Sequence, residues 1–156
     1  MRILFVCTGN TCRSPMAEAI ARHVAVERGL TDIVVESAGT GAHEGTAASD
    51  GALLVGMEQG VDLAGHRSRT LTPELVASAD AIFTMSSQHL HRVEELGGGG
   101  KSYLLTDFAS HGSAPRNVTD PFGGDLATYR ATYEELEGEI RRVFDRLVSR
   151  GVPPAP

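Results

Sequence analysis

The stretch that most constrains this sequence is a short segment near its N-terminus, in which Cys7 is followed after five residues by Arg13. The apolar residues 3–6 before it predict a short buried strand. Residues 8–11 contain the glycine and asparagine of a tight turn, and Ser14-Pro15 predicts the cap and first position of a helix. The segment is therefore predicted to be a strand, a loop and a helix in direct succession.

A loop of this kind forms a cradle for a tetrahedral oxyanion such as phosphate. Its backbone N–H groups point inward, and the positive end of the helix dipole adds to their attraction for an anion. Cys7 lies at the bottom of the cradle, where comparable surroundings lower a cysteine pKa from about 8.5 to roughly 3.5–7.5. We therefore expect Cys7 to be a thiolate at neutral pH. The residues expected to bind the phosphate are Thr8, Gly9, Asn10, Thr11, Cys12, Arg13 and Ser14.

Two side chains of the loop can assist the thiolate and its ligand directly. The planar guanidinium of Arg13 can hold two phosphate oxygens at once, a geometry that lysine lacks, and Ser14 can donate its hydroxyl to the sulfur. Taken singly, a buried cysteine at a strand end is typical of a packing residue. Because the whole loop is present, we interpret Cys7 as a nucleophile and Arg13 as the clamp for its oxyanion.

These residues resemble the signature of the low-molecular-weight protein tyrosine phosphatases, which is a cysteine, five residues and Arg-Ser near the N-terminus. Within that family the run Thr-Gly-Asn-Thr-Cys-Arg-Ser-Pro-Met-Ala-Glu is similar to the bacterial branch that contains protein arginine phosphatases. In that branch a threonine stands at the Thr11 position in place of a bulkier aliphatic residue. The resemblance covers the length of the chain and implies a hydrolase that forms a phosphocysteine with no cofactor and no metal.

The resemblance also implies roles for residues far from the loop. Asp120, in the run Thr-Asp-Pro-Phe-Gly-Gly, matches the family's general acid, which protonates the leaving group. Asp107 and Asp125 are weaker rivals, and Asp125 is expected to cap the final helix. The alternative for Asp120 is a turn-capping aspartate before a proline. The hydrogen-bond network that the family implies comprises Asn10, Ser14, Ser37 and His66.

The resemblance leaves two substrates open, phosphoarginine and phosphotyrosine. The small polar Thr11 suits a planar, hydrogen-bonding guanidinium better than a β-branched aliphatic residue would. The chain has no tryptophan, and the loop after Gly39 has no aromatic residue, although Phe122 and Tyr129 remain near the acid. We therefore favour phosphoarginine, with Thr11 and Phe122 as specificity residues, and keep phosphotyrosine as the alternative.

Three other functions compete with a phosphatase. An arsenate reductase shares this loop and fold but is expected to need cysteines outside the loop, whereas Cys7 and Cys12 both lie inside it. A phosphocarrier domain has no need of Arg13 or Asp120. A non-catalytic phosphoprotein-binding module is expected to lose the nucleophile or the acid. The two cysteines also suggest a reversible disulfide that acts as a redox brake, with a buried, packing Cys12 as the alternative.

Composition and charge limit the partners and the number of domains. With 156 residues, of which 41% are hydrophobic, the chain predicts one domain over residues 1–156. A net charge of −6 argues against nucleic acid as a partner. No apolar run approaches the roughly 18 residues of a membrane span, and a signal-peptide pattern is absent, so we expect a cytoplasmic monomer that acts on phosphorylated protein side chains. His89 and His91 would face different directions on a helix, so a metal site there is not expected.

Predicted strands alternate with helices along the chain, which predicts an α/β fold with a four-stranded parallel sheet and helices on both faces. Residues 37–40 are predicted to form a turn, and residues 107–124 a long loop whose length suggests function. Ligands of such sheets bind beyond the C-terminal ends of the strands, where the Cys7 loop is expected. The strands are predicted at 3–6, 33–35, 80–85 and 103–105, and the helices at 15–28, 47–59, from 73, 87–96 and 126–147.

Overall fold

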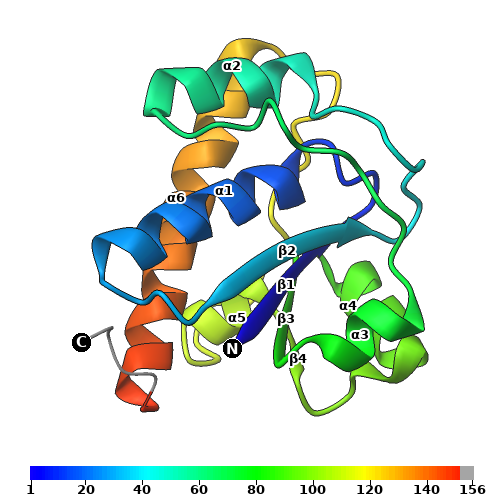
Figure 1. The fold of residues 1–156 in the computed structure, drawn as a ribbon, viewed down its shortest axis with the longest axis vertical. Coiled ribbons are helices and arrows are strands. Elements are labelled where there is room, and N and C mark those ends of the chain that lie inside the picture. Colours follow the sequence, from blue (N-terminus) through cyan, green and yellow to red (C-terminus); the bar gives the residue numbers. More distant parts are fainter. Residues whose placement is uncertain (152–156) are drawn as a thin grey trace.

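The computed structural model describes residues 1–151, and its centre is a sheet of four parallel strands (Figure 1). Strand β1 (Arg2–Cys7) lies between β2 (Val34–Gly39) and β3 (Ala81–Thr84). Strand β4 (Ser102–Leu104) pairs with β3 at the edge. The order β2-β1-β3-β4 confirms the predicted α/β sheet, and the cysteine loop leaves it at the C-terminal end of a central strand.

One face of the sheet is covered by the two longest helices together with two shorter ones. Helix α1 (Arg13–Glu27), α5 (Leu105–Ala109) and α6 (Leu126–Ser149) contribute to one large core, and α2 (Asp50–Gln59) packs against α6 and α1. The amphipathic spacing of the last segment predicts α6 correctly. Within residues 1–151, no helix is both long enough and apolar enough to cross a membrane.

The opposite face carries two short helices (Figure 1). Helix α3 (Pro73–Ser78) begins as predicted, because the hydroxyl of Thr72 accepts a hydrogen bond from the backbone three residues later and proline occupies the first helical position. Helix α4 (Ser87–Val93) is followed by a turn (Glu94–Gly98) in which the backbone kinks at Gly97, whose φ is 98°. Both helices pack on a smaller apolar core, so the prediction of helices on both faces is confirmed.

Strand β1 is buried on both sides, which explains why its sequence is an uninterrupted apolar run. Ile3 and Phe5 point into the large core with α1 and α6, whereas Leu4 and Val6 point into the smaller core with α3 and α4. All four side chains are at most 2% exposed. A strand buried in this way cannot shift its register without moving apolar side chains, so the start of the loop is fixed in place.

Two predicted irregular segments are more regular than expected. The prediction of a turn at residues 37–40 is wrong for residues 37–39, because β2 continues to Gly39, which pairs with Cys7. The predicted loop at 107–124 begins within α5. Parallel pairing with β1 therefore extends the second strand beyond the part that its apolar residues predict.

The predicted start of the first helix is also wrong. Helix α1 begins at Arg13, after Cys12, whose side chain makes no cap hydrogen bond. The hydroxyl of Ser14 bonds instead with Cys7 and Asn10. A residue type that usually caps helices is used here for a tertiary contact.

We expect Gly39→Ala to weaken both the fold and anion binding, because an added methyl group would push against the loop. A Cβ at this position would overlap the carbonyl oxygen of Thr8 and lie 3.0 Å from the backbone nitrogen of Asn10. Overpacking of this kind costs about 1–3 kcal/mol. Urea unfolding and calorimetric titration with inorganic phosphate measure the two effects. Gly65→Ala is the control, because its Cβ meets nothing within 4 Å, and equal losses in both variants would contradict the prediction.

Candidate active site

The loop between β1 and α1 borders a cavity of about 220 Å³ at the C-terminal edge of the sheet. Asn10 turns the chain there with a φ of 56°, in the left-handed region that asparagine tolerates better than most residues. The structure brings the predicted nucleophile, clamp and acid to this one cavity. Its lining comprises Cys7, Thr8, Gly9, Thr11, Cys12, Arg13, Asp120 and Phe122.

The side chain of Asn10 is the centre of a buried hydrogen-bond network. Its Nδ2 donates to Oγ of Ser14 at 2.8 Å and to Oγ of Ser37 at 2.9 Å. Its Oδ1 accepts from the backbone N–H of Arg69 at 2.9 Å. His66 Nε2 lies 2.7 Å from the Asn10 carbonyl oxygen, which can only accept, so this ring nitrogen is the donor. The structure thus brings together the four residues for which the sequence predicts a network.

Ser14 connects this network to the sulfur of Cys7, which lies 2.8 Å from its hydroxyl. Because Asn10 donates to the same oxygen, the hydroxyl hydrogen of Ser14 is free to point at the sulfur. Burial raises the pKa of Cys7 and outweighs the Ser14 hydrogen bonds and the Arg13 charge, which lower it. The predicted thiolate at neutral pH is contradicted on this point, because the prediction omitted the cost of burying an anion.

Arg13 is buried and connects the cysteine loop to the loop that carries the predicted acid. Its Nη1 donates to the carbonyl oxygen of Val118 at 3.1 Å, and its Nη2 lies 3.5 Å from Oδ2 of Asp120. The backbone N–H of Val118 donates to the carbonyl oxygen of Met85, directly after β3, at 2.8 Å. The acid loop is therefore fixed both to the start of α1 and to the end of β3.

Asp120 uses its two carboxylate oxygens for different contacts. Oδ1 accepts from the backbone N–H of Phe122 at 3.1 Å, which is the turn-capping arrangement that the sequence offered as the alternative. Oδ2 faces Arg13. The side chain is 52% exposed, so the turn contact leaves the carboxylate accessible from the cavity.

The two rival aspartates lie elsewhere. Asp125 caps α6, as predicted, by accepting a hydrogen bond from the backbone N–H of Thr128 at 2.9 Å. Asp107 lies on α5 and does not line the cavity. Among these three aspartates, Asp120 is the one beside Cys7 and Arg13.

Cys12 is buried, and its contacts match the packing alternative. Its sulfur lies 3.3 Å from the hydroxyl of Ser49 and 3.3 Å from that of Tyr129. Burial and the Cys12 hydrogen bond raise the pKa of Tyr129 to about 12, so its hydroxyl stays neutral. Both cysteines are free thiols, and a reversible disulfide with Cys7 stays a prediction.

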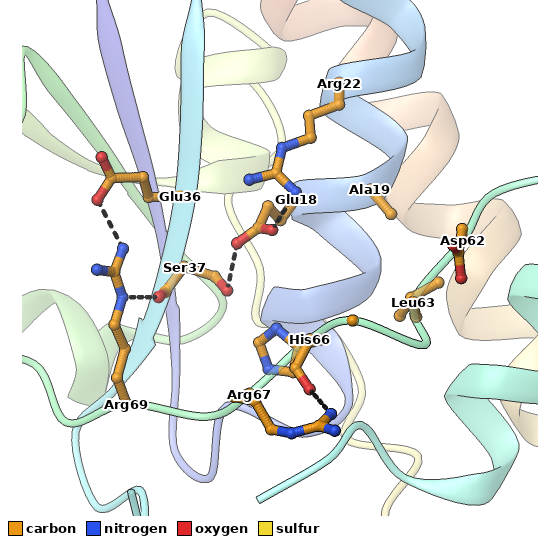
Figure 2. A pocket seen from close by; sticks show the side chains of 11 residues that line it. Glu18, Ala19, Arg22, Glu36, Ser37, Asp62, Leu63, His66, Arg67 and Arg69 are labelled. Carbon is orange, nitrogen blue, oxygen red and sulfur yellow. Dashed lines mark hydrogen bonds and ion pairs between the residues drawn. The ribbon is translucent and has the colours of Figure 1, made fainter. Parts of the chain in front are cut away.

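A second cavity, of about 470 Å³, borders the outer side of the network (Figure 2). Ser37 donates its hydroxyl to Oε1 of Glu18 at 2.8 Å, and Oε2 of the same carboxylate pairs with Arg22 at 2.7 Å. Arg69 donates to the carbonyl oxygen of Ser37 at 3.0 Å and pairs with Glu36 at 2.6 Å. Hydrogen bonds and one ion pair thus join α1, β2 and the segment before α3 on the outer side of the network.

Several residues that contact the cavity or the network were not predicted as site residues from the sequence. The spacing of Glu18 and Arg22, four residues apart on a predicted helix, was a signal for an ion pair, whereas the carbonyl contact of Val118 has no sequence signal. His89, considered in the sequence only as a metal ligand, is buried beside the cysteine loop. Among residues 1–151, no group of three or more His, Cys, Asp or Glu side chains is arranged to hold a metal ion.

The chain is similar to known proteins in sequence and in overall structure. Residues 2–151 match the family described as low molecular weight phosphotyrosine protein phosphatase. A protein-arginine-phosphatase of Geobacillus stearothermophilus is 40% identical over 94% of this chain and 95% of its own. The low molecular weight protein-tyrosine-phosphatase PtpB of Staphylococcus haemolyticus is 37% identical over 87% of this chain and 92% of its own. A structure of the arginine phosphatase YwlE, in which the serine that replaces the active-site cysteine is phosphorylated, has a TM-score of 0.89 at 36% identity, covering 98% of this chain and 100% of that one.

Ser14→Ala removes the hydroxyl beside Cys7, and we expect the pKa of Cys7 to rise further, because that hydrogen bond lowers it. Alkylation by iodoacetamide requires the thiolate. The midpoint of its pH profile at Cys7, followed by mass spectrometry of the modified peptide, should therefore move to higher pH. Ser149→Ala, an exposed change on α6, serves as the control. A midpoint that stays in place or falls would show that the Ser14 hydroxyl does not stabilise the thiolate.

Proposed function

The chain belongs to the low molecular weight phosphotyrosine protein phosphatase family and is a cysteine phosphatase, and from this membership we propose that its substrate is phosphoarginine in proteins. The observation that carries the choice is Thr11, which lines the cavity beside Cys7 and Asp120. A threonine hydroxyl can hydrogen-bond to the guanidinium next to the phosphoryl group, whereas a bulkier aliphatic side chain would offer apolar surface to a ring. The relative named as a protein-arginine-phosphatase supports the same substrate.

The first chemical step transfers the phosphoryl group to Cys7. The thiol of Cys7 first gives its proton to solvent water, and the hydroxyl of Ser14 and the charge of Arg13 stabilise the resulting thiolate. The sulfur attacks phosphorus, an S–P bond forms and the P–N bond of phosphoarginine breaks. Asp120 gives its proton to the departing nitrogen, so that the neutral leaving group is expelled. The half-exposed position of Asp120 in the lining of the cavity that also contains Cys7 supports this role.

The second step hydrolyses the phosphocysteine. The Asp120 carboxylate, which has given up its proton, takes a proton from water as the water oxygen attacks phosphorus, and the S–P bond breaks. Arg13 and the loop N–H groups stabilise the charge on the phosphoryl oxygens in both steps. The phosphorylated active-site serine of the related arginine phosphatase supports Cys7 as the group that receives the phosphoryl group.

Phosphotyrosine is the second candidate substrate. The exposed ring of Phe122 lines the cavity and could stack on a phenol, since aromatic pairs prefer such contacts. The tyrosine phosphatase among the relatives also favours it. The two substrates differ in the group directly above the phosphate, which is a polar guanidinium in one and an apolar ring in the other. Thr11 is therefore the position at which they can be distinguished.

Asp120→Asn removes the proton donor, and we expect it to slow poor leaving groups far more than good ones. General acid catalysis contributes about 10²–10⁴-fold, so turnover of phenyl phosphate should fall by that order, whereas the activated 4-nitrophenyl phosphate should lose much less. Steady-state kinetics on both esters measure the difference. Asp125→Asn, the helix cap, is the matched control and should affect both substrates alike. An equal loss on both esters in Asp120→Asn would indicate a structural role.

Thr11→Ile replaces the hydroxyl with apolar bulk, and we expect it to lower kcat/KM for phosphoarginine by roughly tenfold, the order of one lost hydrogen bond. The value for phosphotyrosine should stay unchanged or rise. The measurement is the ratio of the two values in the wild type and the variant, with the exposed Thr31→Ile as control. A wild type that already prefers phosphotyrosine, or a ratio that does not move, would favour the tyrosine phosphatase instead.

A further inference from the structure

His89 is a buried side chain beside the cysteine loop, and the chemistry above gives it no role. It lies in the first turn of α4 and is 4% exposed. Its Nε2 lies 2.8 Å from Oγ1 of Thr8, the residue after Cys7, and its Nδ1 lies 2.9 Å from Oγ of Ser86. The imidazole therefore connects the residue that caps α4 to the wall of the active-site cavity, which Thr8 lines.

The imidazole of His89 is neutral at physiological pH. Burial lowers its pKa to about 4, the positive charge of Arg13 acts in the same direction, and the carboxylate of Asp120 opposes them. A neutral imidazole has one N–H group, so one ring nitrogen donates a hydrogen bond and the other accepts one. Its neighbours decide which nitrogen is the donor.

The hydroxyl of Ser86 determines the tautomer. Ser86 is buried, and its oxygen accepts a hydrogen bond from the backbone N–H of His89 at 3.4 Å. Its own O–H group needs an acceptor, because buried polar groups are almost always hydrogen-bonded. Within the part of the chain that the structure describes, the acceptor beside this hydroxyl is Nδ1 of His89. Nδ1 therefore accepts, and Nε2 carries the proton and donates to Thr8.

Because the Thr8 hydroxyl accepts a hydrogen bond from His89, its own hydrogen remains free to be donated to another partner. The cavity that Thr8 lines also contains Cys7 and Arg13, so that partner can be a phosphoryl oxygen held between them. We propose that the Thr8 hydroxyl donates a hydrogen bond to the phosphoryl group of the substrate and that His89 is the positioning residue that sets it as a donor. This rests on the proposed chemistry at Cys7 but not on the choice between phosphoarginine and phosphotyrosine.

The side chain of Thr8 thereby adds a donor to those of Arg13 and the loop N–H groups. Its geometry is fixed before the substrate arrives, because His89 is itself held by Ser86 at the start of α4. A donor oriented in advance loses little entropy when the anion binds. The neutral state of His89 matters here, since a protonated ring would need an acceptor on both nitrogens and would lose the bond that Ser86 donates.

Binding of inorganic phosphate, measured by calorimetry and as competitive inhibition of 4-nitrophenyl phosphate hydrolysis, tests the proposal. Thr8→Val removes the hydroxyl and keeps the shape, and His89→Phe keeps a ring without its nitrogens. Each should raise the dissociation constant of phosphate on the order of tenfold, as expected for one hydrogen bond. The double variant should be no weaker than either single variant, because both remove the same interaction.

Two further variants separate this role from general packing. His89→Gln retains an N–H group that can reach Thr8 and should bind phosphate within about threefold of the wild type. His91→Phe, on the exposed side of the same helix, should leave binding unchanged. The proposal would be overturned if Thr8→Val bound phosphate as tightly as the wild type, or if the losses of phosphate affinity in the two single variants multiplied in the double variant. It would also be overturned if His89→Gln bound phosphate as weakly as His89→Phe, or if His91→Phe lost as much phosphate affinity as His89→Phe.

The tautomer can be measured on the wild-type protein, which covers the case in which His89→Phe does not fold. Nitrogen-15 NMR of the histidine rings should show the proton of His89 on Nε2 at pH 7. A proton on Nδ1 would overturn the proposal, because the Thr8 hydroxyl would then donate its hydrogen bond to Nε2 of His89 and not to the phosphoryl group. A failure of the phosphoarginine assignment is distinguishable, since it would alter the ratio of the two substrates and leave phosphate affinity and the tautomer as stated.

Discussion

The active site depends on one buried side-chain amide, that of Asn10, which is 0% exposed. Its left-handed backbone costs roughly 1–2 kcal/mol for a residue other than glycine. Four hydrogen bonds offset this cost, with Ser14, Ser37, the backbone of Arg69 and His66 as partners. A buried donor or acceptor left unsatisfied costs about 1–3 kcal/mol, so each partner depends on the others. The loop that binds the anion is thus held by contacts made on its far side.

The cysteine loop is ordered by being buried, but burial also disfavours the negative charge that the Cys7 sulfur needs for its attack on phosphorus. Burial raises the pKa of Cys7, and the nearby guanidinium of Arg13 is itself buried. The carboxylate of Asp120 lies 3.5 Å from that guanidinium and is half exposed, so it neutralises the positive charge weakly. A phosphoryl group between Cys7 and Arg13 would place further negative charge beside this guanidinium. Affinity for phosphate therefore arises from a buried cation that the protein alone compensates only in part.

The sequence predicts the parts of this arrangement that depend on local patterns. Apolar runs predict the strands, the spacing of Cys7 and Arg13 together with the family resemblance predicts the loop, and the resemblance alone directs attention to Asp120 among three aspartates. Local patterns fail where tertiary contacts compete. Ser14 has the residue type of a helix cap, but its hydroxyl is used by the network. The carbonyl of Val118, which holds Arg13, is a backbone group and carries no sequence signal.

The junction between β3 and α4 couples the two loops that must meet at the phosphorus atom. The carbonyl oxygen of Met85 accepts from Val118, and the backbone N–H of Ser87 donates to the side chain of Asn117 at 3.0 Å, so the acid loop is anchored there twice. Two residues further along, His89 contacts Thr8 of the cysteine loop. A short stretch of chain therefore fixes the acid loop and the cysteine loop to the same strand end. Because the central strands are buried on both faces, a displacement of either loop must break contacts at this junction instead of shifting the sheet.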